Sequence, residues 1–310
     1  MPTEAVTSFP GVICIGEALT DMLSTGTNQW LSVNGGATWN VARAIAKLGQ
    51  HCAFAGAVSN DLFGHALREA SVAAGLDTRT LQVLDYSPLL AIVDNQQPPN
   101  YFFIGDDSAD LHFDSAKLPQ GWNSNLRWAH FGGISLARQP LAKNLVELAQ
   151  QLHQQGVAIS YDPNFRNLMG PDYDVVLQQM TRLASVIKVS DDDLRGLFRS
   201  NDAEAGFAKL RAINPEAIYL YTRGSAGASL HIGEQSWQCA VPTIVTADTV
   251  GAGDASIAGM LYSLMQRTEA SWPEHLRFAV ACGAAACLQR GAHAGDLAQV
   301  MQLYQSLATN

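Results

Sequence analysis

The sequence predicts an α/β protein with a mostly parallel central sheet and helices on both faces. Short apolar runs alternate with longer segments of helical periodicity along the 310 residues. This repetition is typical of parallel sheets, because the crossover helices cover both faces. The length would allow two domains, but single α/β domains reach this size, and we see no long linker or internal repeat. We therefore expect one domain, residues 1–310, with ligands at the carboxyl ends of the strands.

The expected elements follow one another in order. The first strand is Val12–Ile15, and the first helix, Gly36–Leu48, carries Ala, Ile and Leu on one side and ends at Gly49. A second strand and helix, Cys52–Val58 and Asp61–Ala74, repeat the unit. Later elements are expected at His130–Phe131, Leu141–His153, Val157–Tyr161, Val175–Ala184, Val186–Val189 and Ile218–Thr222. Each later strand follows a helical segment, as a parallel sheet requires.

Two stretches interrupt this rhythm. Residues 22–33 are polar and rich in turn residues, and residues 89–112 read as two short strands joined by QQPPN. They predict a discontinuous β lid, from about residue 20 to 34 and from 88 to 113, although an ordinary edge hairpin fits equally well. Exposed strand edges need covering, so we expect Leu89–Val93 and Tyr101–Ile104 to pair with a second subunit in a homodimer.

The composition excludes several classes of partner. Hydrophobic residues make up 47% of the chain, which argues against disorder, and the net charge of -9 opposes binding to nucleic acid or to an anionic membrane. No apolar run approaches the ~20 residues that cross a bilayer, and the first residues lack the pattern of a signal peptide. Five scattered cysteines without CxxC spacing indicate free thiols in a reducing compartment. These features predict a cytoplasmic protein.

The strongest chemical signal is DTVGAGD at residues 248–254, at the start of a helical stretch. Gly251 and Gly253 permit unusual backbone angles and close approach of a ligand. The amides of Ala252, Gly253 and Asp254 would face outward at a helix N-terminus, where an anion is favoured. Such donors suit phosphoryl transfer, with Asp254 taking the proton of an attacking hydroxyl. A glycine-rich turn capped by Asp254 is the plainer alternative.

A second segment makes the first more specific. Gly35-Gly36 enters a helix, Asn40 lies one turn in, and Lys47-Leu48-Gly49 follows. In order and separation, the two segments resemble the signatures of the ribokinase-like (PfkB) carbohydrate kinases, GG-xxx-N-x-A and DTVGAGD. The resemblance runs from Val12 to about Gly295. It implies the ribokinase-like fold and ATP-dependent phosphorylation of a sugar hydroxyl, with Gly251, Ala252, Gly253 and Asp254 as the catalytic group.

The resemblance also implies a set of sugar-binding residues. Asp21 resembles the family aspartate that holds sugar hydroxyls, and a turn residue is the alternative. Gly35, Gly36 and Asn40 resemble the floor of the sugar site. Phe103 resembles an aromatic residue that lines the sugar pocket from the lid, with core packing of the lid as the alternative. Arg166, in DPNFR, resembles an arginine that faces the substrate and the transferred phosphate; a surface ion pair is the alternative.

Further matches imply ATP and metal sites. KVSDDD at residues 188–193 resembles the K-x-N-x-x-E segment that supports phosphate and Mg²⁺ through water, with Ser190 in place of Asn and Asp193 in place of Glu. An acidic helix N-terminus would also explain it. The expected ATP-binding residues are Lys188, Ser190, Thr222, Gly224, Gly227, Gly253 and Cys282. Asp248 and Val250 resemble residues that hold a monovalent cation, K⁺, in some members, but the matching late segment, GAHAG, lacks the usual proline.

Three segments resemble the fructokinase branch of the family: Ser108-Ala109-Asp110, DPNFR and KVSDDDL. This resemblance implies conversion of D-fructose to fructose 6-phosphate. Gly105 stands where relatives often carry an arginine that binds a substrate carboxylate, and Asp106 and Asp107 follow it, which predicts a neutral sugar with Asp106 sharing its hydroxyls. 2-Keto-3-deoxygluconate kinase, ribokinase and adenosine kinase remain alternatives. A non-catalytic sugar sensor is the alternative from another class.

Overall fold

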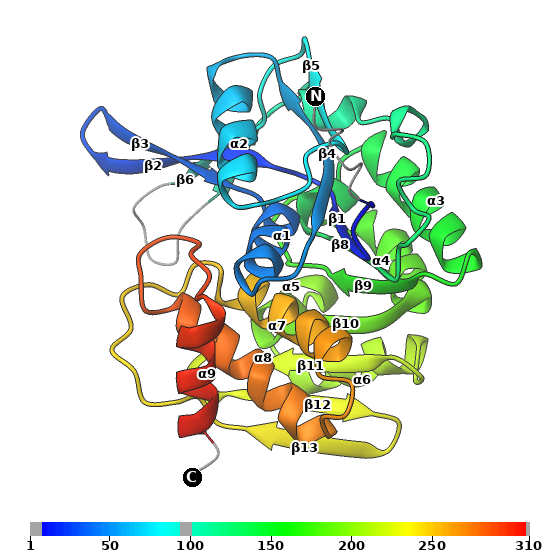
Figure 1. The fold of residues 1–310 in the computed structure, drawn as a ribbon, viewed down its shortest axis with the longest axis vertical. Coiled ribbons are helices and arrows are strands. Elements are labelled where there is room, and N and C mark those ends of the chain that lie inside the picture. Colours follow the sequence, from blue (N-terminus) through cyan, green and yellow to red (C-terminus); the bar gives the residue numbers. More distant parts are fainter. Residues whose placement is uncertain (1–7, 94–100, 308–310) are drawn as a thin grey trace, which may run out of the picture.

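The computed structural model describes residues 8–93 and 101–307, and within them nine strands form one main sheet (Figure 1). Their order is β13-β12-β11-β10-β9-β8-β1-β4-β5, parallel from β11 to β5, with β12 and β13 antiparallel at one edge. The strands are β1 (Val12–Ile15), β4 (Ala53–Ser59), β5 (Leu81–Leu84), β8 (Trp128–Gly132), β9 (Ala158–Asp162), β10 (Ala184–Ser190), β11 (Ile218–Thr222), β12 (Ala228–Ile232) and β13 (Gln235–Cys239). The predicted α/β class is confirmed.

Helices cover both faces of the main sheet because successive strand residues point to opposite sides. In β1, Val12 and Cys14 pack with α1, α2, α7 and α8, whereas Ile13 and Ile15 pack with α3, α4, α5 and α6. The helices are α1 (Ala37–Lys47), α2 (Leu62–Ala73), α3 (Leu141–Gln154), α4 (Tyr173–Leu183), α5 (Asp191–Phe198), α6 (Ala203–Ile213), α7 (Ala252–Gln266), α8 (Trp272–Ala286) and α9 (Leu297–Ser306). Strand β1 therefore contributes to two apolar cores.

Four strands form a second, small sheet beside the main one (Figure 1). They are β2 (Leu19–Gly26), β3 (Gln29–Gly35), β6 (Leu90–Val93) and β7 (Tyr101–Ile104), in the order β3-β2-β6-β7. The edge-hairpin alternative is therefore wrong, because β6 and β7 join β2 and β3 rather than the main sheet. Residues 96–100, expected to connect two of these strands, lie outside the described residues.

The small sheet also corrects the expected pairing with a second subunit. Strand β6 is parallel to β2 on one side and antiparallel to β7 on the other. Its backbone is thus paired within the chain, so the predicted strand Leu89–Val93 has no edge left for another copy. In the small sheet, only the two outer strands, β3 and β7, have an unpaired edge within the described part of the chain.

The other differences from the sequence prediction are local. Ala184 begins β10 instead of ending the preceding helix, which runs from Tyr173 to Leu183. The hairpin β12–β13 and helices α6 and α9 were not expected. All five cysteines are free, as predicted. None of the described helices combines the length and the hydropathy of a membrane span.

Candidate active site

A cavity of about 750 Å³ lies at the carboxyl ends of the central strands, where the strand order predicts it. Its walls come from segments that follow β1, β9, β10 and β11, from the starts of α1 and α7, and from the small sheet. Most predicted site residues line it, namely Asp21, Gly36, Asn40, Phe103, Arg166, Lys188, Ser190, Asp193, Thr222, Gly224, Gly227, Val250, Gly251, Ala252, Gly253 and Asp254. Gly35, Asp248 and Cys282 are not among the lining residues.

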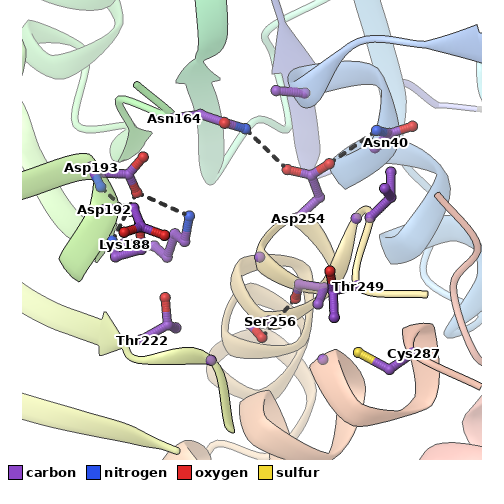
Figure 2. A pocket seen from close by; sticks show the side chains of 18 of the residues that line it. Asn40, Asn164, Lys188, Asp192, Asp193, Thr222, Thr249, Asp254, Ser256 and Cys287 are labelled. Atoms are coloured by element: carbon purple, nitrogen blue, oxygen red, sulfur yellow. Dashed lines mark hydrogen bonds and ion pairs between the residues drawn. The ribbon is translucent and has the colours of Figure 1, made fainter. Parts of the chain in front are cut away.

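Asp254 lies in the first turn of α7 with both carboxylate oxygens held by amides (Figure 2). The side-chain amide of Asn40, on α1, donates to Oδ2 at 2.9 Å, and that of Asn164, after β9, donates to Oδ1 at 3.4 Å. Burial raises the pKa of Asp254, while the Asn40 hydrogen bond and the charges of Lys188 and Arg166 limit the rise. The carboxylate is thus oriented from two sides and retains its basicity.

The start of α7 depends on glycine. Gly251 has φ +80°, and a Cβ there would lie 3.0 Å from the Cα of Ala292. The amide of Ala252 donates to the carbonyl of Thr249 at 3.2 Å, which corrects the prediction that it is free for an anion. The amides of Gly253 and Asp254 have no backbone acceptor among the described residues. These two N–H groups at a helix N-terminus remain available to an anionic ligand.

A buried cation, Lys188, borders this helix start. Its ammonium lies 3.1 Å from Asp162 Oδ2 and 3.5 Å from Asp193 Oδ2, and a Cβ on Gly253 would lie 3.0 Å from it. Burial alone would lower the pKa of Lys188, but the charges of Asp162, Asp193 and Asp254 raise it well above its usual range. Lys188 is therefore a fixed positive charge beside the free amides of α7.

Asp193 forms part of the cavity wall and is held by the protein. Its Oδ1 accepts from the backbone amide of Phe165 at 2.8 Å and its Oδ2 from that of Ser190 at 2.8 Å, completing a capping box at the start of α5. Burial acts to raise its pKa, but Lys188 and these hydrogen bonds lower it below the usual value. The acidic helix start expected as an alternative is thus present together with the contact to Lys188.

The carboxylates at the cavity suit a hard cation that keeps most of its waters. Oxygen donors of this kind are those that Mg²⁺ prefers. The described residues contain no cluster of three close ligands. Asp192 and Asp193 both line the cavity, Asp192 with an exposed side chain and Asp193 with a buried one. The residues present fit a magnesium ion that is bound mainly by a nucleotide and touches the protein through water.

One end of the cavity combines an acid, an arginine and two aromatic rings. Burial raises the pKa of Asp21 to about 6, and the charge of Arg166 opposes that rise. The Arg166 guanidinium donates to Asn164 Oδ1 at 2.6 Å and lies 5.1 Å from the ring centre of Tyr101. Tyr101 and Phe103, on β7, stack with their ring centres 6.4 Å apart. The alternative of a surface ion pair for Arg166 is not supported, because its partners lie at the cavity.

Two predicted sugar-site features have other surroundings. Asp106 is exposed and does not line the cavity, and Asp107 contacts His112 at 2.6 Å. Neither residue of the acidic pair after Gly105 therefore lines the cavity. Gly35 acts indirectly, because a Cβ there would lie 2.3 Å from Asp21 Oδ2.

The opposite end of the cavity is mostly apolar. The turn after β11 contributes Thr222, Gly224 and Gly227, and further lining comes from Val241, Pro242, Ile244, Val280 and Ala284. Cys282 was expected here, but its side chain is buried against α7, where a Cβ on Gly259 would meet its sulfur at 2.5 Å. Cys287, one residue beyond α8, lines the cavity in its place (Figure 2).

Asp248 shapes the loop that leads into α7. Its Oδ1 accepts from the amides of Thr249 and Val250, and its Oδ2 accepts from the amide of Gly291 at 2.8 Å. These bonds lower its pKa against the opposing effect of partial burial. Asp248 thus joins the loop before α7 to the loop after α8.

Four residues of the site were not assigned a role from the sequence. Tyr101 is two positions from Phe103, so strand alternation would have placed both rings on one face. Asn164 and Asp162 are part of DPNFR, but Asn164 contacts Asp254 on α7 and Asp162 contacts Lys188 on β10, both distant in the chain. Glu17, buried after β1, gave no signal beyond its place in GEALTD.

Comparison with known proteins identifies the fold and the family. The model of the pfkB family carbohydrate kinases matches residues 11–298. A fructokinase from Salmonella typhimurium is 30% identical over 288 residues, which cover 90% of this chain and 93% of that protein. The structure of a fructokinase from Xylella fastidiosa with bound ATP has a TM-score of 0.85 at 27% identity and covers 96% of this chain and 98% of its own. That of aminoimidazole riboside kinase from Salmonella enterica has a TM-score of 0.81 at 26% identity, covering 94% and 99%.

Proposed function

The chain belongs to the pfkB family of carbohydrate kinases, and from this premise we propose that it transfers the γ-phosphoryl group of ATP to the C6 hydroxyl of D-fructose. One observation carries the proposal most directly. Asp254 is held by Asn40 and Asn164 at the start of a helix whose amides at Gly253 and Asp254 lack backbone acceptors. The carboxylate that would act as the base therefore lies beside the amides that would bind the phosphoryl group. Attack of a hydroxyl on a phosphoryl group requires both.

The residues divide the reaction between them. Asp254 accepts the proton of the sugar hydroxyl. The oxygen of that hydroxyl forms a bond to the γ-phosphorus, and the bond from the γ-phosphorus to the bridging oxygen of ATP breaks, leaving ADP. The α7 amides and Lys188 oppose the negative charge of the moving phosphoryl group. Asn40 Oδ1 is buried and has no hydrogen-bond partner among the described residues, and a sugar hydroxyl would satisfy it.

Mg²⁺ would be held through water by Asp192 and Asp193 and would supply charge neutralisation at the ATP phosphates. The small sheet, with Tyr101 and Phe103, would act as the lid that excludes water, so that ATP is not hydrolysed. The apolar end, from Thr222 and Gly224 to Cys287, would take the nucleotide.

The charges at the cavity favour a neutral sugar. The lining residues include six carboxyl groups and only two cations, Lys188 and Arg166, among the described residues. ATP already brings several negative charges, so a substrate with its own carboxylate or phosphate would be repelled. Asp21 and Asn40 supply acceptors for sugar hydroxyls instead. This argument disfavours 2-keto-3-deoxygluconate as the substrate.

A riboside kinase is the second candidate. The stacked rings of Tyr101 and Phe103 at the sugar end would also pack against a heteroaromatic base. The similarity to aminoimidazole riboside kinase supports this reading.

A coupled ADP-release assay separates these candidates. The substrates are fructose, ribose, adenosine, aminoimidazole riboside, 2-keto-3-deoxygluconate and hexose phosphates. We expect kcat/KM for fructose to be at least tenfold above that for every other compound. A higher value for either anion would overturn the neutral-sugar assignment, and a higher value for the riboside would establish the second candidate. Sugar binding without ADP release from any of them would indicate a sensor.

The proposal also covers the oligomeric state of the enzyme, a K⁺ site and its cellular location. The free edges β3 and β7, with exposed Trp30, Leu31, Phe102 and Ile104, support a homodimer formed through the small sheet. A K⁺ ion beside the loop at Asp248 and Val250 is retained as a proposal, to be tested by replacing K⁺ with Na⁺ in the assay. Five free thiols and the use of ATP support a cytoplasmic location.

A further inference from the structure

A buried carboxylate at the edge of the cavity has no part in the chemistry described above. Glu17 is only 1% exposed and lies between β1 of the main sheet and β2 of the small sheet, where the chain passes from one sheet to the other. An unpaired buried carboxylate is costly, so such a group is kept where its oxygens are used. No charged side chain contacts it among the described residues; its partners are the backbone amides of Ala37 and Ser135 and the hydroxyl of Ser135.

Each oxygen of Glu17 holds a different segment of the chain. Oε1 accepts from the amide of Ala37 at 3.0 Å, and Oε2 accepts from the amide of Ser135 at 3.2 Å. Ala37 begins α1, two residues after the small sheet ends at Gly35, and Ser135 lies in the turn after β8. The Glu17 carboxylate therefore joins three segments: the chain between β1 and β2, the start of α1 after β3, and the turn after β8.

Two glycines lie so close to Glu17 that a side chain on either of them would collide with it. A Cβ on Gly133 would lie 2.2 Å from Glu17 Oε1, and a Cβ on Gly36 would lie 2.5 Å from the carbonyl oxygen of Glu17. Both glycines have positive φ. The hydroxyl of Thr38 also donates to the Glu17 carbonyl at 3.1 Å. The two neighbouring loops are thus shaped around this one residue.

The segments that Glu17 joins carry the sugar end of the cavity. Glu17, Ala37 and Gly133 line the cavity, as do Asp21 and Asn40. Helix α1 has no side-chain cap of its own at Gly36, so Glu17 supplies the acceptor from 20 residues away. One turn further along the same helix, Asn40 donates to Asp254. The helix whose start Glu17 holds therefore carries Asn40, a residue of the sugar end.

We propose that Glu17 is a positioning residue that sets the sugar site, by holding the start of α1 and the turn after β8 at a fixed separation. The inference rests on the proposed function, because it concerns the same site. It predicts that loss of the carboxylate loosens sugar binding specifically, while the nucleotide end, which Glu17 does not touch, is unaffected.

The chain offers a matched control for a carboxylate that only caps a helix. Asp61 accepts from the amides of Phe63 and Gly64 at the start of α2 and does not line the cavity. It also accepts from the hydroxyl of Ser59 at 2.6 Å, so all of its partners lie within three residues of it and it joins no distant segments. Asp61→Asn therefore shows how far the loss of a helix-capping carboxylate changes the kinetics through lower stability alone.

The test compares Glu17→Gln with Asp61→Asn by steady-state kinetics on the best sugar of the wild-type enzyme. The glutamine keeps one acceptor and turns an NH₂ group toward the second amide. Burial raises the pKa of Glu17 to about 7, so a neutral side chain is tolerated there and the variant should fold. We expect a KM for the sugar about tenfold above wild type, with kcat within threefold and the KM for ATP within twofold. Asp61→Asn should leave both KM values unchanged even where it lowers Tm more.

A sugar KM of Glu17→Gln within twofold of wild type, or an equal rise in the KM for ATP, would overturn the proposal. Should the variant not fold, amide hydrogen exchange of the wild-type enzyme decides. We expect sugar binding to slow exchange at Ala37 and Ser135 more than at Phe63 and Gly64, and an equal effect at both pairs would refute the positioning role. A wild-type enzyme inactive on fructose but active on another sugar would refute only the choice of fructose.

Discussion

The two ends of the cavity are built from different kinds of side chain. At the sugar end, Asp254, Lys188 and Arg166 are each held by named partners at hydrogen-bond or ion-pair distance. At the nucleotide end, Val280, Ile244 and their neighbours offer apolar surface, and no charged group is fixed by a network there among the described residues. Segments from many parts of the chain meet at the first end, whereas α8 and one loop make most of the second.

This difference fits the two tasks in the proposed function, phosphoryl transfer at one end and nucleotide binding at the other. Moving a phosphoryl group requires charges at fixed positions, and an error of about 1 Å there is costly. A nucleotide base needs mainly a surface of suitable shape, which several apolar residues provide together. Substitutions at the sugar end should therefore have large and specific effects, and those at the nucleotide end small and uniform ones.

Asp254→Asn should have the largest effect. The amide cannot take the proton of the sugar hydroxyl, so we expect kcat to fall by roughly two to four orders of magnitude, the range for a positioned general base. Sugar affinity, measured by calorimetry without ATP, should change little. A variant with kcat within threefold of wild type would show that Asp254 is not the base.

Lys188→Met should follow. It leaves the carboxylates of Asp162 and Asp193 buried without their cation, which costs about 3–5 kcal/mol of unfolding free energy. Denaturant titration measures the loss. The double variant Lys188→Met/Asp162→Asn should recover part of it, because one of the two charges is then removed, and no recovery would contradict this account of the pair.

The pH dependence of sugar use should identify Asp21. Burial raises its pKa to about 6, so the carboxylate that accepts sugar hydroxyls is present above that pH and is protonated as the pH falls through it. We therefore expect kcat/KM for the sugar to fall below about pH 6. Asp21→Asn should lower kcat/KM at pH 8 and flatten the acid limb at the same time. An acid limb unchanged in this variant would assign it to another group.

Val280→Ala should have the smallest effect. Removal of two methyl groups from the nucleotide end costs about 1 kcal/mol of binding, so the KM for ATP should rise by less than about tenfold. The kcat value and the KM for the sugar should stay within twofold of wild type. A large drop in kcat would mean that the nucleotide end also positions the reacting groups, and the contrast between the two ends would fail.

Light scattering and mutation test the role of the small sheet as an interface. We expect a dimer at micromolar concentration, and Phe102→Glu should make it monomeric because this exposed ring lies on the free-edge strand β7. A wild-type monomer would contradict the proposed assembly.

The sequence by itself determined the alternation of strands and helices and the glycines at the start of α7. Strand periodicity and helix ends are local properties, written in a few consecutive residues, and Gly251 has the positive φ that its place before a helix requires. The nearness of Asn40 to Asp254 was not visible in spacing, since 214 residues separate them. It could be expected only because both segments resemble signatures of one family.

The tertiary structure alone decided which groups face the cavity. Cys282 and Cys287 are five positions apart near the end of α8, and only the packing of α7 against α8 buries the first and leaves the second at the cavity wall. The same holds for Glu17 and Lys188, whose partners lie on other helices, strands and turns. A side chain's burial, charge state and partners depend on residues distant in the chain, so local sequence fixes the kind of residue present and the fold fixes what it does.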